Sequence, residues 1–191
     1  LSLHERRNQL AMGLQERGVT MGNRVGLRMK NTPEFHEGLF ACNKIGAVAV
    51  GLNFRLSCLE LFAIIDDAQP KVVIADQEHS RTLDRLTSRH VPEHVITLGI
   101  AYEDELANIS SDSNPVSGEP NDPMLILYSS GTTGRAKGIT LSNKNFSYIE
   151  PMATDLYRMN KSSVYLLVSP LFHIGGVATG SALMTLGGRT V

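Results

Sequence analysis

The clearest chemical signal in the sequence is a segment of hydroxyl-bearing residues and glycines, between residues 128 and 138. It reads YSSGTTGRAKG and follows an apolar stretch that we expect to be a strand. The serine and threonine hydroxyls belong to Ser129, Ser130, Thr132 and Thr133. Glycines allow turns with positive φ, so several backbone N–H groups can converge on one point. The glycines of this segment are Gly131, Gly134 and Gly138.

Lys137 adds a compact positive charge on a flexible stem near the end of this segment. Hydroxyls, converging amides and an ammonium group suit a polyphosphate, whose oxygens accept charge-assisted hydrogen bonds. The composition alone fits a functionless surface loop equally well. The position directly after a strand, together with the basic end, favours phosphate binding.

A second phosphate-binding pattern, the GxxxxGK(S/T) loop of nucleotide hydrolases, fits the segment less well. Counted from Gly131, Lys137 has the right offset. However, Ala136 replaces the second glycine, and Gly138 replaces the hydroxyl residue that would hold Mg²⁺. The segment also continues into an extended stretch, residues 139–141, so that no helix begins directly at the phosphates.

The second informative segment reads PLFHIGG over residues 170–176 and contains His173. It follows an expected strand, residues 163–169, and opens a helix of small residues. Parallel α/β sheets bind ligands at the carboxyl ends of their strands, so His173 could bond a phosphate or face a carboxylate there. A histidine with no other signal around it more often has a structural role.

Strands and helices are expected to alternate along the chain. This order predicts an α/β fold of mostly parallel sheets flanked by helices. Apolar periodicity predicts helices over 3–17, 33–45, 58–68, 78–88, 143–159 and 176–186. It predicts strands over 24–29, 47–52, 71–75, 94–98, 124–128 and 163–169. Asn31 and Thr32 are candidate caps of the second helix, and Ser57 with Glu60 forms a capping box for the third.

A stretch rich in Ser, Asn, Asp and Pro, residues 109–123, indicates a linker. It predicts a first α/β subdomain over 1–108 and the start of a second over 124–191. The chain opens with Leu1 rather than Met, and residues 189–191 read as a strand too short to pair. We therefore expect the sequence to be a piece of a longer protein.

The composition excludes several classes of protein. The 191 residues are 42% hydrophobic and 19% charged with a net charge of −1, and Trp is absent, which argues against a nucleic-acid partner. No apolar run reaches the roughly 18 residues of a membrane span. We expect Cys42 and Cys58 to be buried free thiols, as in a reducing, cytoplasmic compartment.

Residues 128–138 resemble the signature loop of the adenylate-forming superfamily, which usually reads (Y/F)TSGTTGxPKG. This superfamily includes acyl-CoA synthetases, peptide-synthetase adenylation domains and firefly-type luciferases. Ser129 stands where Thr is usual, and Ala136 where Pro is usual. Residues 170–176 resemble the PxFHxxG motif of the same superfamily. Residues 43–55 are similar to the KxGAVxVPLNxR stretch of acyl-CoA synthetases, with Gly51 in place of Pro.

The resemblance implies a fold and a set of roles. The fold would be the N-terminal portion of the large domain of acyl-CoA synthetases. The loop would grip the β- and γ-phosphates of ATP through Ser129, Ser130, Gly131, Thr132, Thr133, Gly134 and Lys137. Lys137 would also stabilise the departing pyrophosphate, and Thr133 is the residue expected to contact Mg²⁺. His173 would line the acyl pocket near the α-phosphate.

The resemblance further implies an AMP-forming acid–thiol ligase whose substrates are ATP, CoA and a carboxylic acid, which we expect to be a fatty acid. An oligomer is possible. The superfamily's YGxTE and TGD segments, and its C-terminal domain with the catalytic lysine, do not occur in these 191 residues. We therefore expect this chain to be inactive alone. Two alternatives stay open: another adenylate-forming enzyme, such as a peptide-synthetase adenylation domain or a luciferase-like enzyme, and a non-catalytic folding fragment.

Overall fold

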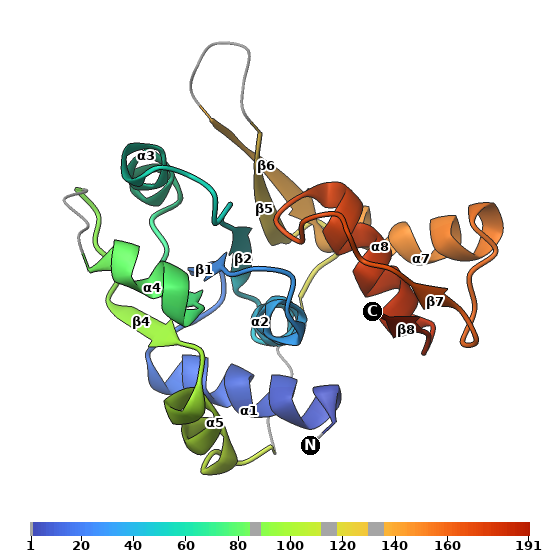
Figure 1. The fold of residues 1–191 in the computed structure, drawn as a ribbon, viewed down its shortest axis with the longest axis horizontal. Helices are drawn as coiled ribbons and strands as arrows, with labels where there is room; N and C mark the ends of the chain where they lie inside the picture. The colour runs from blue at the N-terminus through green and yellow to red at the C-terminus, as the bar shows by residue number, and fades with distance from the viewer. Residues whose placement is uncertain (1, 85–88, 112–117, 130–135) are drawn as a thin grey trace.

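The computed structural model describes residues 2–84, 89–111, 118–129 and 136–191. Six strands form one sheet in the order β4-β3-β1-β2-β5-β6 (Figure 1). The strands are β1 (Arg24–Arg28), β2 (Val48–Gly51), β3 (Val72–Ala75), β4 (His94–Thr97), β5 (Pro123–Ser129) and β6 (Lys137–Ser142). The first five are parallel, and β6 runs antiparallel to β5. The predicted fold class, a mostly parallel sheet flanked by helices, is confirmed.

Helices cover both faces of this sheet (Figure 1). On one face lie α1 (Leu3–Glu16), α2 (Pro33–Lys44) and α5 (Ile100–Ala107), and on the other α3 (Cys58–Ala68) and α4 (Gln77–Leu83). Strand side chains alternate between the two cores, as Ile74 and Val73 do. Because both faces are covered, β2 and β3 are buried throughout and read as continuous apolar runs.

Capping residues and a proline in the sequence correctly predicted where α2 and α3 begin. Ser57 and Glu60 form the predicted capping box at the start of α3. Pro33 opens α2, where its fixed φ suits the first helical turn. The prediction that Asn31 or Thr32 caps α2 is wrong in its chemistry, because Thr32 occupies the cap position without a side-chain hydrogen bond. The sequence did not predict α5.

The last third of the chain departs most from expectation. The helix expected over 143–159 is divided into α6 (Asn143–Ser147), α7 (Ile149–Pro151) and a π-helical turn, η1 (Met152–Leu156). Pro151 lacks an N–H group and crowds the preceding turn, which interrupts a regular helix. The helix α8 (Ile174–Thr185) lies close to its predicted range.

The strand expected over 163–169 shrinks to β7 (Val164–Tyr165). It pairs in parallel with β8 (Arg189–Thr190), so the expectation that residues 189–191 are too short to pair is wrong. Within the larger sheet, β5 pairs directly with β2, which joins residues from both sides of the 109–123 stretch. The division into subdomains 1–108 and 124–191 stays a prediction.

The two cysteines are free, but only Cys42 is buried. The expectation for Cys58 is wrong because this residue begins α3, and its side chain is exposed to solvent. No helix in the described ranges is long and apolar enough to cross a bilayer.

Candidate functional site

Ser129 and Lys137, the two ends of the predicted phosphate loop, lie directly opposite each other where β5 ends and β6 begins. Lys137 is exposed, and within the described part of the chain it forms no ion pair. The structure thus places a hydroxyl and a free ammonium group at the carboxyl end of a parallel strand. The other predicted contacts lie outside the described residues: Ser130, Gly131, Thr132, Thr133 and Gly134.

Tyr128 anchors the end of β5 to the helix layer. Its hydroxyl donates a hydrogen bond to Asp67 Oδ2 on α3 at 2.5 Å. Burial and this carboxylate raise the pKa of Tyr128, so the phenol keeps its proton. Gly138 lies opposite Tyr128, and a Cβ at Gly138 would stand 3.2 Å from Tyr128 Cζ. Gly138 therefore provides space for the ring; a turn with positive φ, the role expected for it, does not occur there.

The segment that carries His173 leads into α8. Leu171 and Phe172 are buried, whereas His173 is exposed and occupies the cap position of the helix. The backbone N–H of His173 donates to the Pro170 carbonyl at 3.1 Å, which folds the segment into a tight turn. A Cβ at Gly176 would overlap that same carbonyl. Of the two neighbouring glycines, the packing requires Gly176, whereas no atom of the described residues lies within 4 Å of a Cβ built at Gly175.

Asn31 holds this segment against the sheet, a role that sequence reasoning missed. It follows β1, at the carboxyl edge. Its Nδ2 donates to the carbonyls of Leu167 and Ser169 at 3.0 and 2.9 Å. Its Oδ1 accepts from the backbone N–H of Leu171 at 3.0 Å. An Asn shortly before a Pro also suits a helix cap, so the sequence alone carried an ambiguous signal.

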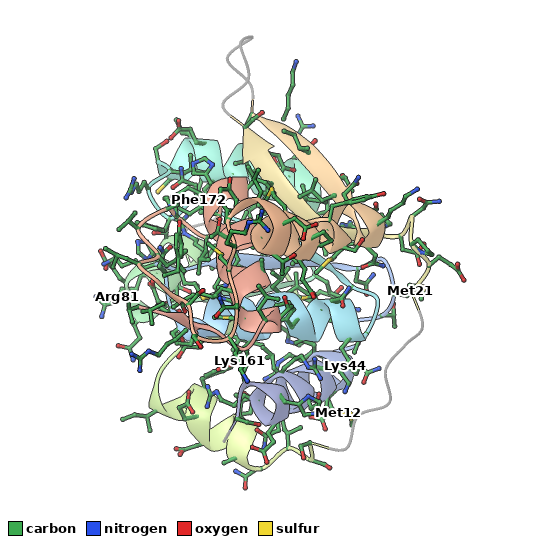
Figure 2. All side chains as sticks on the ribbon, turned by 90° about the vertical axis from the view of Figure 1, so that its right-hand side faces the viewer. Met12, Met21, Lys44, Arg81, Lys161 and Phe172 are labelled. Atoms are coloured by element: carbon green, nitrogen blue, oxygen red, sulfur yellow. The ribbon has the colours of Figure 1, made fainter. Side chains whose placement is uncertain are left out.

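Phe172 brings the same segment to the end of β2. A Cβ on Gly51, the last residue of β2, would stand 3.3 Å from Phe172 Cα, so the two backbones approach closely. Gly51 pairs with Leu127 of β5, two positions before Ser129. His173 therefore lies at the same edge of the sheet as Ser129 and Lys137. Figure 2 labels Phe172 on the loop before α8.

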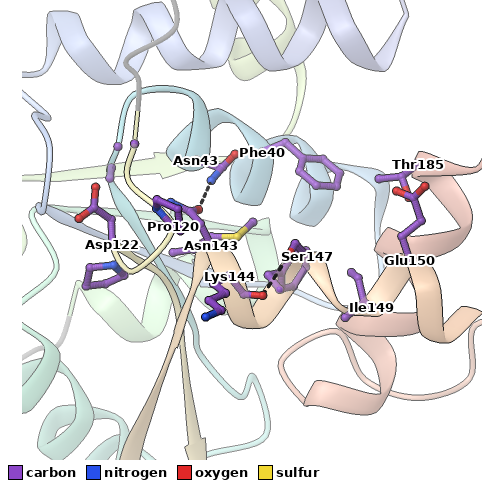
Figure 3. Close-up of a pocket in the computed structure, with 16 residues that line it drawn as sticks. Phe40, Asn43, Pro120, Asp122, Asn143, Lys144, Ser147, Ile149, Glu150 and Thr185 are labelled. Carbon is purple, nitrogen blue, oxygen red and sulfur yellow. Dashed lines mark hydrogen bonds between the residues drawn. The ribbon is translucent and has the colours of Figure 1, made fainter.

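A cavity of about 620 Å³ lies elsewhere, at the amino ends of β2 and β5 (Figure 3). Its lining includes Ala47, Pro123 and Lys144, and Asn43 Nδ2 donates to Asn143 Oδ1 across it at 2.8 Å. Of the predicted site residues that the structure describes, Ser129, Lys137 and His173, none lines this cavity. We place the candidate site at the carboxyl edge because the chemistry-bearing side chains gather there.

Comparison with known proteins identifies the family of this chain. The family model for AMP-binding enzymes matches residues 2–191. Feruloyl-CoA synthase from Amycolatopsis sp is 34% identical over 99% of this chain and 37% of its own length. The fatty acid–[acyl-carrier-protein] ligase ScoC of Streptomyces coeruleorubidus is 30% identical over 92% of this chain and 34% of its own length.

Two solved structures share the fold. ATP-bound MatB from Rhodopseudomonas palustris matches with a TM-score of 0.88 and 28% identity, over 98% of this chain and 38% of its own. The inhibitor-bound N-terminal domain of FACL13 from Mycobacterium tuberculosis matches with a TM-score of 0.88 and 27% identity, over 99% and 49%. This chain thus spans 34% to 37% of the length of the curated relatives named above. It belongs to the AMP-binding enzyme family.

Proposed function

We propose that this chain is the phosphate-binding part of an ATP-dependent acid–thiol ligase. Such an enzyme activates a carboxylic acid as acyl-AMP and then transfers the acyl group to CoA. The observation that carries the proposal is the pairing of Ser129 with Lys137 at the carboxyl end of β5. The ATP-bound state of MatB and the names of the acid–CoA ligases among the relatives add support.

The proposed reaction has two steps. In the first, a carboxylate oxygen of the acid bonds to the α-phosphorus of ATP, the bond to the bridging oxygen breaks, and pyrophosphate leaves. Lys137 and the hydroxyls and amides of residues 129–134 would contact the β- and γ-phosphates. Their donors stabilise the charge that grows on pyrophosphate more than that of bound ATP, and this difference lowers the barrier.

In the second step, the thiol of CoA gives up its proton to solvent and its sulfur bonds to the acyl carbon, while the bond from that carbon to the phosphate oxygen breaks and AMP leaves. His173 lies at the same edge of the sheet, and we assign it to the acyl side of the site, near the α-phosphate. A carrier-protein thiol in place of CoA is the second candidate, since ScoC is named for an acyl-carrier-protein acceptor. The relatives named for fatty acids favour a fatty acid as the substrate.

Mg²⁺ would accompany ATP, with Thr133 as its protein contact. The described residues contain no group of three His, Cys, Asp or Glu side chains that could hold a metal ion. Phosphate oxygens of ATP would therefore supply much of its coordination, as is common for this ion. We also propose a cytoplasmic location, which the free thiols of Cys42 and Cys58 favour.

The test compares Lys137→Ala with Lys144→Ala in the intact ligase. Both lysines are exposed, but Lys144 lies on α6, at the opposite edge of the sheet. Carboxylate-dependent exchange of pyrophosphate into ATP should fall by about 10²–10³-fold in Lys137→Ala, the usual loss for one transition-state donor. The Lys144→Ala enzyme should match the parent. Equal exchange rates in the two variants would disprove the proposed role of the loop.

A further inference from the structure

We propose that Phe54, whose backbone is held by the buried Arg28, is a positioning residue for His173. The importance of His173 in acyl transfer rests on the function proposed above. The packing that links Phe54 to His173 is a property of this chain and can be tested separately.

A continuous row of rings connects the two residues. Phe54 lies in the turn after β2, and its ring centroid is 5.4 Å from that of Phe172 in an edge-to-face arrangement of 84°. Phe172 in turn lies 4.7 Å from His173. On its other side Phe54 contacts His79 at 5.2 Å. Edge-to-face pairs favour defined geometries, so the position of Phe54 constrains the ring next to His173.

His79 is itself fixed. Its Nδ1 lies 2.6 Å from Asp76 Oδ1, and the same carboxylate oxygen accepts a hydrogen bond from the His79 backbone N–H. The side chain of His79 is mostly buried. The row of rings is therefore anchored at the end remote from His173.

Arg28 holds the turn that presents Phe54. This arginine ends β1 and is 1% exposed. Its Nη1 donates to the Asn53 carbonyl at 3.1 Å, and its Nη2 reaches the Phe54 carbonyl at 3.5 Å. Nε has no partner, and within the described residues no Asp or Glu forms an ion pair with Arg28.

Asp76 offsets only part of the cost of burying the Arg28 charge, because burial outweighs this attraction and lowers the pKa of Arg28. A buried cation whose desolvation cost is only partly offset contributes little to stability. An apolar side chain of similar volume would pack this position at least as well. The distinct effect of Arg28 is to hold two consecutive carbonyls of the turn. Those two contacts fix the backbone from which the Phe54 ring projects.

Gly51, at the end of β2, contacts Phe172 from the side of the sheet. Its lack of a side chain lets Phe172 approach β2, since a Cβ there would stand 3.3 Å from Phe172 Cα. Phe172 is thus held between the end of β2 and the Phe54 ring. If the Phe54 ring is removed, β2 still blocks Phe172 on one side, but Phe172 can move into the space that the ring occupied. His173, the next residue, would move with it.

The first experiment observes His173 directly in this chain, with ¹⁵N-labelled histidine and the imidazole resonances assigned through a His173→Gln variant. Phe54→Leu should shift and broaden the His173 resonances, whereas Phe54→Tyr, which keeps the ring, should preserve them. Tyr148→Leu, which removes an exposed ring on a different part of the chain, is the matched control. Unchanged His173 resonances in Phe54→Leu would overturn the inference.

Arg28→Met separates positioning from stability. We expect a Tm equal to or above that of the parent, because the buried charge is removed. We also expect the His173 resonances to shift as in Phe54→Leu, since the turn has lost its two contacts. A large drop in Tm, or a normal Tm with unshifted His173 resonances, would show that Arg28 does not position this site.

The second experiment measures acyl transfer by the intact ligase. Phe54→Leu should lower kcat by about 10- to 100-fold, the range expected for a misplacement of about 1 Å, while the KM for ATP stays unchanged. Phe54→Tyr should restore the rate. Parent-like kcat in Phe54→Leu would refute the positioning role. Failure of the proposed function has a different signature, namely exchange that is insensitive to Lys137→Ala.

Discussion

The side chain of Asn31 accepts a hydrogen bond from the backbone N–H of Leu171, a residue 140 positions later, at 3.0 Å. The same side chain donates to two carbonyls of this segment, those of Leu167 and Ser169. One amide thus satisfies three backbone groups on the approach to His173. It joins the edge of the large sheet to the start of α8.

We predict that Asn31→Asp lowers the free energy of unfolding by about 1–2 kcal/mol, because the carboxylate keeps the acceptor but loses both donors. It also faces two carbonyl oxygens that it repels. Urea denaturation measures the loss. Asn160→Asp is the matched control, since Asn160 Oδ1 accepts a hydrogen bond from the Ser162 backbone N–H, and Asp retains this acceptor. Equal stabilities of the two variants would contradict the role of Asn31.

The two neighbouring glycines of α8 provide a second test. A Cβ at Gly176 overlaps the Pro170 carbonyl, whereas a Cβ at Gly175 meets nothing within 4 Å. We expect Gly176→Ala to destabilise the chain by about 1–3 kcal/mol or more, as overpacking against backbone does. Gly175→Ala should be neutral or stabilising, by up to about 1 kcal/mol, through helix propensity. Thermal denaturation of the pair decides, and the reverse order would refute this packing.

The sequence predicted those elements whose signals are local. The apolar runs that predicted β2 and β3 are the strands themselves, and the Ser57–Glu60 capping box lies at the start of the helix that it predicted, α3. The break in the expected helix 143–159 had a local cause too, Pro151, but the apolar pattern around it favoured continuity. Short strands such as β7 depend on their partner, and that partner is distant in sequence.

The candidate site was predictable in part. The strand before the loop was predicted, but the pairing of Ser129 with Lys137 was not, because residues 139–141 were interpreted only as a short extended stretch. The role of Asn31 could not be predicted, because its partners are backbone groups 136 to 140 residues away and leave no trace in residue type. Arg28 raised no expectation either, since its burial depends on how the turn after β2 closes over it.

The buried carboxylate of Glu37 links three helices. It accepts hydrogen bonds from Arg6 of α1, at 2.5 and 3.1 Å, and from the hydroxyl of Tyr102 of α5 at 3.1 Å. We predict that Glu37→Ala costs about 1–3 kcal/mol, because the Tyr102 hydroxyl and Arg6 Nε lose their acceptor, while Arg6 keeps its pair with Glu103. Glu103→Ala removes the exposed carboxylate on the same arginine and should cost less than about 1 kcal/mol. Similar losses in urea denaturation would contradict this ranking.

His36 should make the stability of the chain depend on pH. This residue is 1% exposed, and among the described residues its Nε2 has no hydrogen-bond partner. Burial lowers the pKa of His36 from 6.5 to about 4, because the imidazolium form loses its hydration. The unfolded chain therefore binds a proton at this residue below pH 6.5, and the folded chain does so only below about pH 4.

Above pH 6.5, His36 is neutral in both states and its titration does not affect the free energy of unfolding. That free energy falls as the pH decreases from 6.5 to about 4. The full loss, complete below about pH 4, is about 3 kcal/mol. We expect His36→Leu to remove this slope, so the difference in unfolding free energy between parent and variant should change between pH 7 and pH 4.5. Urea denaturation at both values measures it. A difference that does not depend on pH would mean that another group causes any acid sensitivity of the fold.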